Sequence, residues 1–213
     1  MATDLVEINP EEPQPEVIER TAATVRRGGV VAIPTDALYV LVADPFHLAA
    51  VVKVFRAKGR SLHRPLPLLV GDLIMAEDLA AELNNRFFIL ARRFWPGPLT
   101  IIVPASAKVP LKVTSNTGRL ALRQSRSKLA SQLIAMLNQP VVATSANISS
   151  HPTCRSGIEV FGMMDGRVDL VLDGGALTGI GATTVDITDP DWRLIRSGAI
   201  EEKDIADCLQ IEI

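Results

Sequence analysis

The distribution of apolar and polar positions along the chain predicts alternating helices and strands. Helices are predicted where apolar residues recur every three or four positions, over residues 15–27, 46–57, 76–94, 127–137 and 201–208. Strands are predicted where short apolar runs stop at turn residues, over 30–33, 66–70, 99–103, 119–123, 140–144, 168–172, 183–187 and 192–196, with a further apolar stretch at 38–43. Because helices separate many strands while others are adjacent, we expect an α/β fold with a twisted, mixed sheet and flanking helices.

The chain shows no internal repeat and no linker, which favours one domain. Its 213 residues are 47% hydrophobic, enough to bury a core without disulfides or metals. The acidic, Pro-containing start predicts an N-terminal extension over residues 1–14, followed by the domain at 15–200 and a C-terminal helix and tail at 201–213. Charged residues make up 22%, close to the average of soluble proteins, which excludes global disorder.

Several features predict a cytoplasmic protein without a membrane partner. The first seven residues are acidic and lack the basic start and apolar run of a signal peptide. No apolar stretch approaches the roughly 18 residues that cross a bilayer. Cys154 and Cys208 form no disulfide framework, and with His47, His63 and His151 they show no metal-ligand spacing. We therefore expect free thiols and no metal site.

The formal net charge of −2 conceals a strong asymmetry along the sequence. Residues 45–158 hold 15 Lys and Arg but four Asp and Glu, a net charge of +11, whereas the two flanks together carry −13. No acidic residue occurs between Glu82 and Glu159. A protein surface normally mixes the two signs. The central segment therefore predicts a concave basic cleft or an anion site, with a chance cluster on a solvated face as the alternative.

Small hydroxyl, amide and cationic residues follow several predicted strands, although standard catalytic signatures are absent from the sequence. Ligands of open α/β sheets bind at the carboxyl ends of strands, so this placement indicates a site. Thr35 and Asp36 follow one such strand, where a simple turn is the alternative. Lys58 and Arg60 flank a glycine at a predicted helix end, where they either complement the helix dipole or bind an anion.

Three further positions belong to this pattern. Arg123 ends a predicted strand and is placed to bind a substrate carboxylate. The run Thr-Ser-Ala-Asn at 144–147 follows another strand, and its small residues let a ligand approach backbone N–H groups, as phosphate sites require. An N-cap and turn is the alternative there. Arg196 ends the last predicted strand. Each of these signals is weak by itself, and their order along the chain is more informative.

Taken in that order, the motifs resemble the YrdC-like family, the threonylcarbamoyl-AMP synthases of single-domain type. The matching segments are Pro34–Tyr39, Lys58-Gly59-Arg60 with Pro65-Leu66, Trp95–Thr100, Arg123, Ser145-Ala146-Asn147, Asp173-Gly174-Gly175, Thr183–Asp186 and Arg196 with Gly198. The resemblance spans residues 15–200, nearly the whole chain, and implies a single YrdC-like α/β domain.

The resemblance also implies a reaction. Family members are nucleotidyltransferases that convert L-threonine, bicarbonate and ATP into threonylcarbamoyl-AMP, pyrophosphate and water. The product supplies the threonylcarbamoyladenosine modification at position 37 of tRNA. The implied partners are therefore a downstream transferase of that pathway and tRNA or double-stranded RNA. Mg²⁺ is expected on the triphosphate of ATP rather than in a protein cage.

Residue roles follow from the same resemblance. Lys58 and Arg60 are the implied catalytic residues, which hold bicarbonate, carbamate and phosphates. The implied threonine-binding residues are Thr35, Tyr39, Arg123, Ala143 and Thr183. The implied ATP-binding residues are Lys58, Arg60, Ser145, Asn147, Thr153 and Arg196. Because both steps generate anions, a water-poor cleft lined with cations would stabilise the developing charge.

Two departures from the family pattern remove hydroxyl groups from the expected threonine pocket. Ala37 stands where the family usually has Thr, and Ala182 where it usually has Ser. A lost hydrogen bond costs about 0.5–1.5 kcal/mol of binding free energy. We therefore expect a roughly tenfold loss of threonine affinity or the use of another amino acid, unless Thr183 or Thr184 supplies the missing hydroxyl.

Further departures keep other hypotheses open. Val40 replaces a usual Gly and is expected to narrow the cleft, and Gln124-Ser125 replaces an apolar residue followed by Pro. A second hypothesis is a paralogue of the same fold that binds RNA or nucleotide through the basic cleft, with little or no threonine chemistry. A third is the carbamoyl-adenylate module of hydrogenase-maturation carbamoyltransferases, although the expected zinc-finger and acylphosphatase segments are absent from this sequence.

Overall fold

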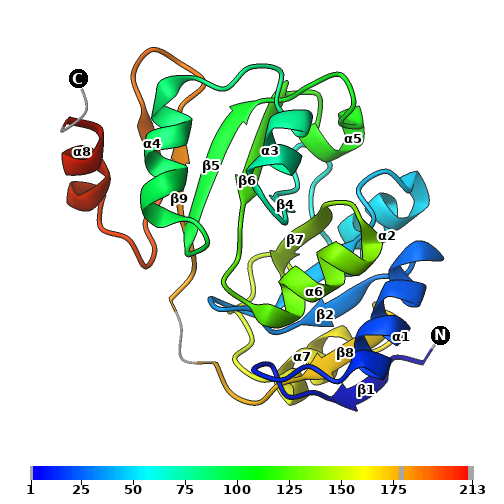
Figure 1. The fold of residues 1–213 in the computed structure, drawn as a ribbon. Helices are drawn as coiled ribbons and strands as arrows, with labels where there is room; N and C mark the ends of the chain where they lie inside the picture. The colour runs from blue at the N-terminus through cyan, green and yellow to red at the C-terminus, as the bar shows by residue number, and fades with distance from the viewer. Residues whose placement is uncertain (1, 178–179, 211–213) are drawn as a thin grey trace.

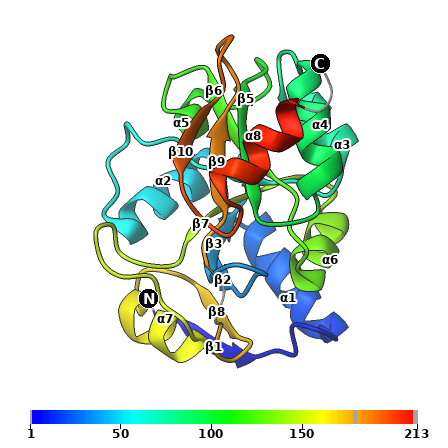
Figure 2. The ribbon, with the colours of Figure 1, turned by 90° about the vertical axis from the view of Figure 1, so that its left-hand side faces the viewer.

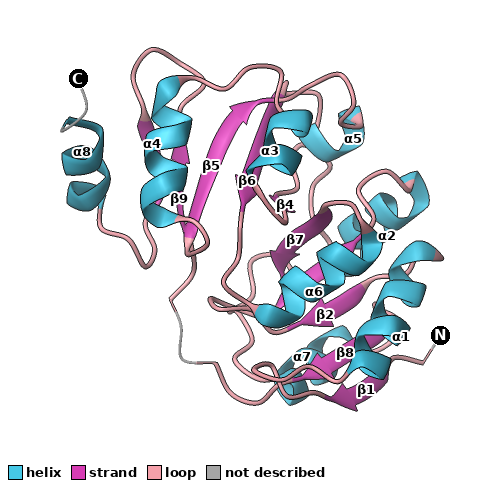
Figure 3. Cartoon of the chain, in the orientation of Figure 1, coloured by secondary structure: helices cyan, strands magenta, loops and turns pink. Residues whose placement is uncertain are grey.

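The strands form one mixed, open sheet in the computed structural model, which describes residues 2–177 and 180–210 (Figure 3). Across the sheet, the strand order is β1-β8-β2-β3-β7-β4-β6-β5-β9-β10. The strands are β1 (Asp4–Glu7), β2 (Val31–Ile33), β3 (Val40–Ala43), β4 (Leu68–Leu69), β5 (Leu99–Pro104), β6 (Arg119–Arg123), β7 (Val141–Ser145), β8 (Leu170–Asp173), β9 (Thr183–Asp186) and β10 (Arg193–Arg196). The helices are α1 (Pro15–Arg26), α2 (Leu48–Lys58), α3 (Leu73–Leu79), α4 (Asn85–Phe94), α5 (Leu111–Thr114), α6 (Lys128–Leu137), α7 (Gly157–Met164) and α8 (Glu202–Gln210).

Parallel and antiparallel pairs both occur in the sheet, which confirms the predicted mixed sheet. β8 is parallel to β1 and β2, β4 is parallel to β6, and β5 is parallel to β9. The pairs β2–β3, β3–β7, β4–β7, β5–β6 and β9–β10 are antiparallel. Strands from the first third of the chain therefore lie beside strands from its last third.

Helices α1 and α6 lie side by side over the β1-to-β7 half of the sheet (Figure 1). They bury Ile18 and Leu133 against Val31 and Leu170 in one apolar cluster. Helices α2 and α7 contribute to a second, larger cluster that extends into the other half of the molecule. Together the two clusters put apolar side chains on both faces of β2, which explains why its sequence is continuously hydrophobic.

Helices α3, α4 and α8 cover the other half of the sheet, and α8 packs against α4 (Figure 2). Ile205 of α8 is fully buried in the same cluster as Phe87 of α4. The Trp95 ring meets the Phe87 ring edge-on, with centroids 5.4 Å apart, and its indole N–H donates to the Leu99 carbonyl at 2.7 Å. The turn after α4 is thus fixed by both packing and a hydrogen bond. None of the helices in the described chain is long and apolar enough to span a bilayer.

The single helix predicted over residues 76–94 is wrong, because the structure divides it into α3 and α4. The backbone of the intervening segment bonds to strand β5 and the residues after it instead of continuing the helix. Ala81 N–H donates to the Pro104 carbonyl, and Ser106 N–H donates to the Leu79 carbonyl, both at 2.9 Å. Asn84 then caps α4 by accepting from Phe87 N–H at 3.2 Å. Tertiary hydrogen bonds therefore override the helical period.

Three elements were missing from the predicted set: β1, α5 and α7. Strand β1 lies inside the segment expected to be an extension, and it pairs with β8 from Asp4 to Glu7. Of the strand predicted at 66–70, Leu68–Leu69 form β4 and pair with the neighbouring strands β6 and β7. The other predicted helices and strands are confirmed within a few residues at each end.

Candidate active site

A cavity of about 600 Å³ opens on the sheet between its two halves, a size typical of small-ligand sites. Its lining comes from the β2–β3 loop, from the segment after α2 and from seven strands. These strands are β3, β4, β5, β6, β7, β9 and β10. The lining residues are Ala37, Leu38, Val40, Arg60, Arg64, Pro65, Pro67, Leu68, Leu69, Thr100, Ile102, Ala121, Arg123, Ala143, Thr144, Ser145, Ala182, Thr184, Ile195 and Arg196.

The charges of this cavity come from arginine. Its lining includes the guanidinium groups of Arg60, Arg64, Arg123 and Arg196, and among the described lining residues there is no Asp or Glu. Small apolar side chains make up most of the remaining surface. Such a lining favours an anionic ligand that also has an apolar or small portion.

Arg123 is the most buried of these cations. Its Nε donates to the Gly97 carbonyl at 2.9 Å, and its Nη2 donates to Asp36 Oδ1 at 2.5 Å. The side chain is 8% exposed and that of Asp36 is 15% exposed. Burial lowers the pKa of Arg123, and the neighbouring Asp36 carboxylate opposes this shift. The pairing of Asp36 with Arg123 was not anticipated, because 87 residues separate the two in the sequence.

Arg60 and Arg196 line the cavity from two different elements: Arg60 follows helix α2, and Arg196 ends strand β10. Gly59, with a φ of 55°, ends α2 in the left-handed conformation, which turns the chain so that Arg60 reaches the cavity. Arg60 Nη2 donates to the Pro65 carbonyl at 2.9 Å. Arg196 Nη2 donates to the Ala182 carbonyl at 2.7 Å, which links β10 to the segment before β9. Burial lowers the pKa of both guanidinium groups.

Lys58 points into the turn that follows β7 rather than into the lining of the cavity. Its ammonium donates to the Ser145 carbonyl at 2.5 Å, the Asn147 carbonyl at 2.8 Å and Asn147 Oδ1 at 3.2 Å. Ser145 Oγ donates to Asn147 Oδ1 at 2.7 Å, and Asn147 Nδ2 donates to the His151 carbonyl at 2.6 Å. The structure therefore brings Lys58, Ser145 and Asn147 together in one polar cluster beside the cavity.

Desolvation sets the protonation behaviour of Lys58. Its side chain is buried, and this burial together with the charge of Arg60 lowers the pKa of Lys58 to about 8. Cys154 lies close enough to oppose the shift. Oxygen atoms of Ser145 and Asn147 nevertheless accept from the ammonium, so the protonated form is well accommodated at neutral pH.

Thr35 and Tyr39 use their hydroxyl groups within the protein. Thr35 Oγ1 donates to the Leu38 carbonyl at 2.6 Å and accepts from Leu38 N–H at 3.2 Å, the geometry of a hydroxyl-closed turn. The Tyr39 hydroxyl donates to the Gly175 carbonyl at 2.7 Å. Burial raises the pKa of Tyr39 to about 12. Neither residue contributes to the described cavity lining, so both shape the loops around it.

Strand alternation separates Thr183 from Thr184. The Thr183 hydroxyl donates to the Ile200 carbonyl at 2.8 Å and is fully buried on the core side. Thr184 lines the cavity, as does Ala143 of β7. Thr153 is exposed in the loop before α7 and is not part of the described lining. Of the two threonines considered as a source of the missing hydroxyl, the structure therefore places Thr184 at the cavity.

Three of the departures noted in the sequence lie at this cavity, whereas Gln124 and Ser125 are outside its described lining. Ala37, Val40 and Ala182 all belong to the lining. Sequence reasoning did not select Arg64 or Thr100, which also line it. For Thr100 a signal was present, because it is the polar member of an otherwise apolar strand, between Leu99 and Ile101. For Arg64, which sits in a loop, the sequence offers no comparable signal.

Comparison with known proteins places the chain in a family. The Sua5/YciO/YrdC family model, described as telomere recombination, matches residues 23–198, so the chain belongs to this family. The threonylcarbamoyl-AMP synthase of Pyrococcus abyssi is 35% identical over 88% of this chain and 56% of the relative. The synthase of Bacillus subtilis is 35% identical over 93% of this chain and 57% of the relative. The chain thus spans little more than half the length of these two relatives.

Relatives of similar length and solved structures complete the comparison. A putative threonylcarbamoyl-AMP synthase of Mycobacterium tuberculosis is 29% identical over 96% of this chain and 94% of the relative. P. abyssi Sua5 complexed with L-threonine matches with a TM-score of 0.93 and 33% identity, over 97% of this chain and 61% of that one. Escherichia coli YciO matches with a TM-score of 0.88 over 95% and 99% of the two chains, and at 24% identity this likeness concerns the fold alone. The expected YrdC-like fold is confirmed.

Proposed function

We propose that this protein is an L-threonylcarbamoyladenylate synthase, which forms threonylcarbamoyl-AMP from L-threonine, bicarbonate and ATP. The observation that carries the proposal is the arginine-lined cavity, in a fold that matches the L-threonine complex of P. abyssi Sua5 with a TM-score of 0.93. Relatives at 35% identity are named as this synthase. Through its product the protein would act in tRNA modification in the cytoplasm, with a downstream transferase as partner.

Arg123 would bind the carboxylate of the amino acid. Its Nε and Nη2 are engaged by Gly97 and Asp36, while Nη1 has no hydrogen-bond partner among the described residues. Nη1 is also not among the fully buried, unsatisfied polar atoms of that part of the chain, so it faces accessible space. A guanidinium edge fixed in this way suits a carboxylate.

The nucleotide would lie toward Arg60, Arg64 and Arg196. Their guanidinium groups complement the charges of a triphosphate, and the Thr144–Ser145 segment of β7 adds small side chains over which a ligand can approach closely. Lys58 would hold the Ser145–Asn147 turn in shape through its hydrogen bonds to both residues. The predicted roles of Thr35, Tyr39 and Thr183 in threonine binding would then be indirect, through the loops and strands that their hydroxyl groups hold. Thr153, predicted to bind ATP, would do so from an exposed loop before α7.

The chemistry requires two bonds to form. The neutral amine of threonine attacks the carbon of bicarbonate, and loss of water leaves a carbamate. A carbamate oxygen then attacks the α-phosphorus of ATP, and pyrophosphate leaves with the electron pair of the broken P–O bond. Negative charge develops in both steps, so the preorganised guanidinium groups of Arg60 and Arg123 would stabilise it in a site with little water.

Mg²⁺ would enter this site with the triphosphate. The cavity lining offers Ser and Thr residues, and the described residues hold no group of three His, Cys, Asp or Glu arranged to bind a metal. This donor set fits an ion that keeps its phosphate and water ligands. Its contribution would be to neutralise the charge of the phosphates.

The test is an assay with purified protein, ATP, bicarbonate and L-threonine. Threonine-dependent pyrophosphate release, with threonylcarbamoyl-AMP identified by mass spectrometry, is the expected result. The matched control is Lys58→Ala, checked for folding by circular dichroism. Folded wild-type protein that releases no more pyrophosphate than this control would refute the synthase. In that case, RNA binding that weakens steeply with salt would favour the alternative of a nucleic-acid-binding paralogue.

A further inference from the structure

Ser125 lies in the short loop between β6 and α6, beside the cavity rather than in its lining. The residue is buried, and its hydroxyl donates to Asp36 Oδ1. The same Oγ accepts from Ser127 N–H at 3.2 Å. A single hydroxyl therefore joins the N-terminal end of α6 to a carboxylate on the β2–β3 loop.

Asp36 Oδ1, on the β2–β3 loop, is bonded to residues of strand β6 and of the β6–α6 loop. The oxygen accepts from both the Ser125 hydroxyl and Arg123 Nη2. With one donor alone, the carboxylate could rotate about its side-chain bonds and take the guanidinium with it. Two donors from different directions fix the position of the oxygen.

The orientation of Arg123 depends on this oxygen. Guanidinium is planar, so two bonded positions determine where the remaining N–H groups point. The first is Nε, bound to the Gly97 carbonyl at 2.9 Å, and the second is Nη2, bound to Asp36 at 2.5 Å. Nη1 is then directed away from both partners. If Asp36 moves, the second fixed point is lost.

We propose that Ser125 is a positioning residue for amino-acid binding: through Asp36, its hydroxyl fixes the Arg123 edge that receives the substrate carboxylate. The inference rests on the proposed function, because it concerns the amino acid of that reaction. It assigns Ser125 a role although the residue does not touch the substrate. A side chain without a hydroxyl at position 125 cannot supply this contact.

The competing interpretation is that Ser125 serves α6 alone. Its Oγ accepts from Ser127 N–H, one of the free N–H groups at the start of that helix. Ser127 itself caps α6 by accepting from Ala130 N–H at 3.3 Å. Ser127→Ala is therefore a matched control, because it weakens the same helix end without touching Asp36.

The kinetic test compares Ser125→Ala, Ser125→Thr and Ser127→Ala with the wild type. We expect Ser125→Ala to raise the KM for L-threonine about tenfold, the effect of losing a hydrogen bond to a charged group, with kcat and the KM for ATP within twofold. Ser125→Thr, which keeps the hydroxyl, should have the wild-type KM for L-threonine. Ser127→Ala should lower Tm without changing the KM. An unchanged KM for L-threonine in folded Ser125→Ala would overturn the inference.

A second measurement does not depend on catalysis. The Nη2–H signal of Arg123, assigned by its loss in Arg123→Lys, should exchange with water several-fold faster in Ser125→Ala than in the wild type and in Ser127→Ala, because Asp36 holds this group. Equal exchange in all three proteins would overturn the inference even if the wild type made no threonylcarbamoyl-AMP. An inactive wild type would count against the proposed function, whereas faster exchange of the Nη2–H signal in Ser125→Ala would still support the positioning role.

Discussion

Strand β6 carries an arginine at each end, Arg119 and Arg123, and the two side chains serve different purposes. They are four residues apart on one strand and therefore lie on the same face of the sheet. Arg123 is buried beside the cavity with one carboxylate, whereas Arg119 is 38% exposed at the far end of the strand. Arg119 is paired with carboxylates of the protein, whereas Arg123 has one carboxylate partner and lines the cavity.

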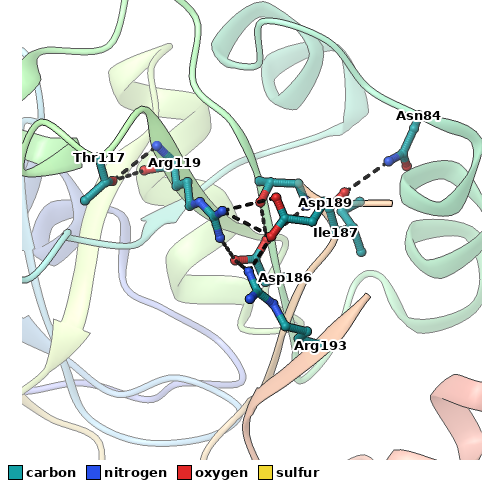
Figure 4. A network of polar contacts seen from close by, with 8 residues as sticks. Asn84, Thr117, Arg119, Asp186, Ile187, Asp189 and Arg193 are labelled. Atoms are coloured by element: carbon teal, nitrogen blue, oxygen red, sulfur yellow. Dashed lines mark hydrogen bonds and ion pairs between the residues drawn. The ribbon is translucent and has the colours of Figure 1, made fainter. Parts of the chain in front are cut away.

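At the far end of β6, two carboxylates surround Arg119 (Figure 4). Its Nη1 donates to Asp186 and its Nη2 reaches both oxygens of Asp189 at 3.3 Å. Arg193 of β10 also donates to Asp189. Burial by itself would lower the pKa of Arg119, but these two carboxylates raise it. The network ties β6 to the turn between β9 and β10.

At the cavity end the balance is reversed. Burial, together with the charge of Arg196, lowers the pKa of Arg123 although the Asp36 carboxylate acts in the opposite direction. Nη1 of Arg123 has no hydrogen-bond partner among the described residues. A guanidinium surrounded by carboxylates is thus saturated and structural, while one with a single carboxylate on one edge remains able to bind an anion.

The largest expected effect is that of Arg123→Met, which removes the cation at the cavity end. We expect threonine-dependent activity to fall more than a hundredfold and the free energy of unfolding to fall by about 2 kcal/mol, because the Asp36 carboxylate loses its charged hydrogen-bond donor. Pyrophosphate release and urea unfolding measure the two effects. Adding Asp36→Asn should recover stability but not activity. Recovery of activity in the double variant would contradict the role given to Arg123.

Asp186→Asn tests the opposite end of the strand. Asp186 is 4% exposed and accepts from Thr188 N–H at 2.9 Å, from Thr188 Oγ1 at 2.6 Å and from Arg119. We expect a loss of about 2 kcal/mol in the free energy of unfolding and an unchanged KM for L-threonine. A large change in KM would show that the two ends of β6 are not separate in function.

The same residue predicts a pH dependence of stability. Burial would raise the pKa of Asp186, but the Thr188 hydrogen bonds and Arg119 together lower it. Its stabilising contribution is therefore complete above the unfolded pKa of about 3.9 and is lost as the pH falls through the lower folded pKa. Urea unfolding of the wild type should weaken more between pH 5 and pH 2 than that of Asp186→Asn. Equal slopes would contradict this assignment.

A smaller effect is expected from restoring a hydroxyl to the cavity. Ala182→Ser adds one oxygen to the lining near Thr184 and should lower the KM for L-threonine three- to tenfold, equivalent to about 0.5–1.5 kcal/mol. Ala182→Val adds bulk without an oxygen and should raise the KM instead. The contrary outcome is that Ala182→Ser leaves the KM for L-threonine unchanged but raises the KM for an apolar amino acid. Ala182 would then make the site specific for an apolar amino acid.

Arg193→Ala should have the smallest effect. Its guanidinium is half exposed, and exposed ion pairs contribute at most about 1 kcal/mol. We expect the free energy of unfolding to fall by about 0.5 kcal/mol at low salt, with most of the difference absent in 1 M NaCl. Urea unfolding at the two salt concentrations measures this. A loss above about 2 kcal/mol would mean that Arg193, like Asp186, is an essential part of the network.

Local periodicity predicted most elements of this fold, because it is set by residues close together in sequence. Strand β6 was predicted with its observed bounds, and helices α1 and α6 to within one residue. The helix over 76–94 was wrong because hydrogen bonds to residues 104–106 interrupt it. The periodicity of a segment gives no information on hydrogen-bond partners that are distant along the chain.

The candidate site divides in the same way. The sequence by itself determined which cations stand at the ends of strands and helices, and of these Arg60, Arg123 and Arg196 line one cavity. Only the tertiary structure decided how the polar groups are used. It closes the hydroxyls of Thr35 and Thr183 onto backbone atoms of the protein and leaves Thr153 in an exposed loop.

The physical reason is that a hydrogen bond requires its partner within about 3 Å, and only folding establishes which groups come that close. Asp36 and Ser125 are 89 residues apart in sequence, yet they share a hydrogen bond that fixes the guanidinium of Arg123. The sequence determined that an arginine ends β6, at the position proposed to bind the substrate carboxylate. The tertiary structure decided which of its edges a substrate can reach.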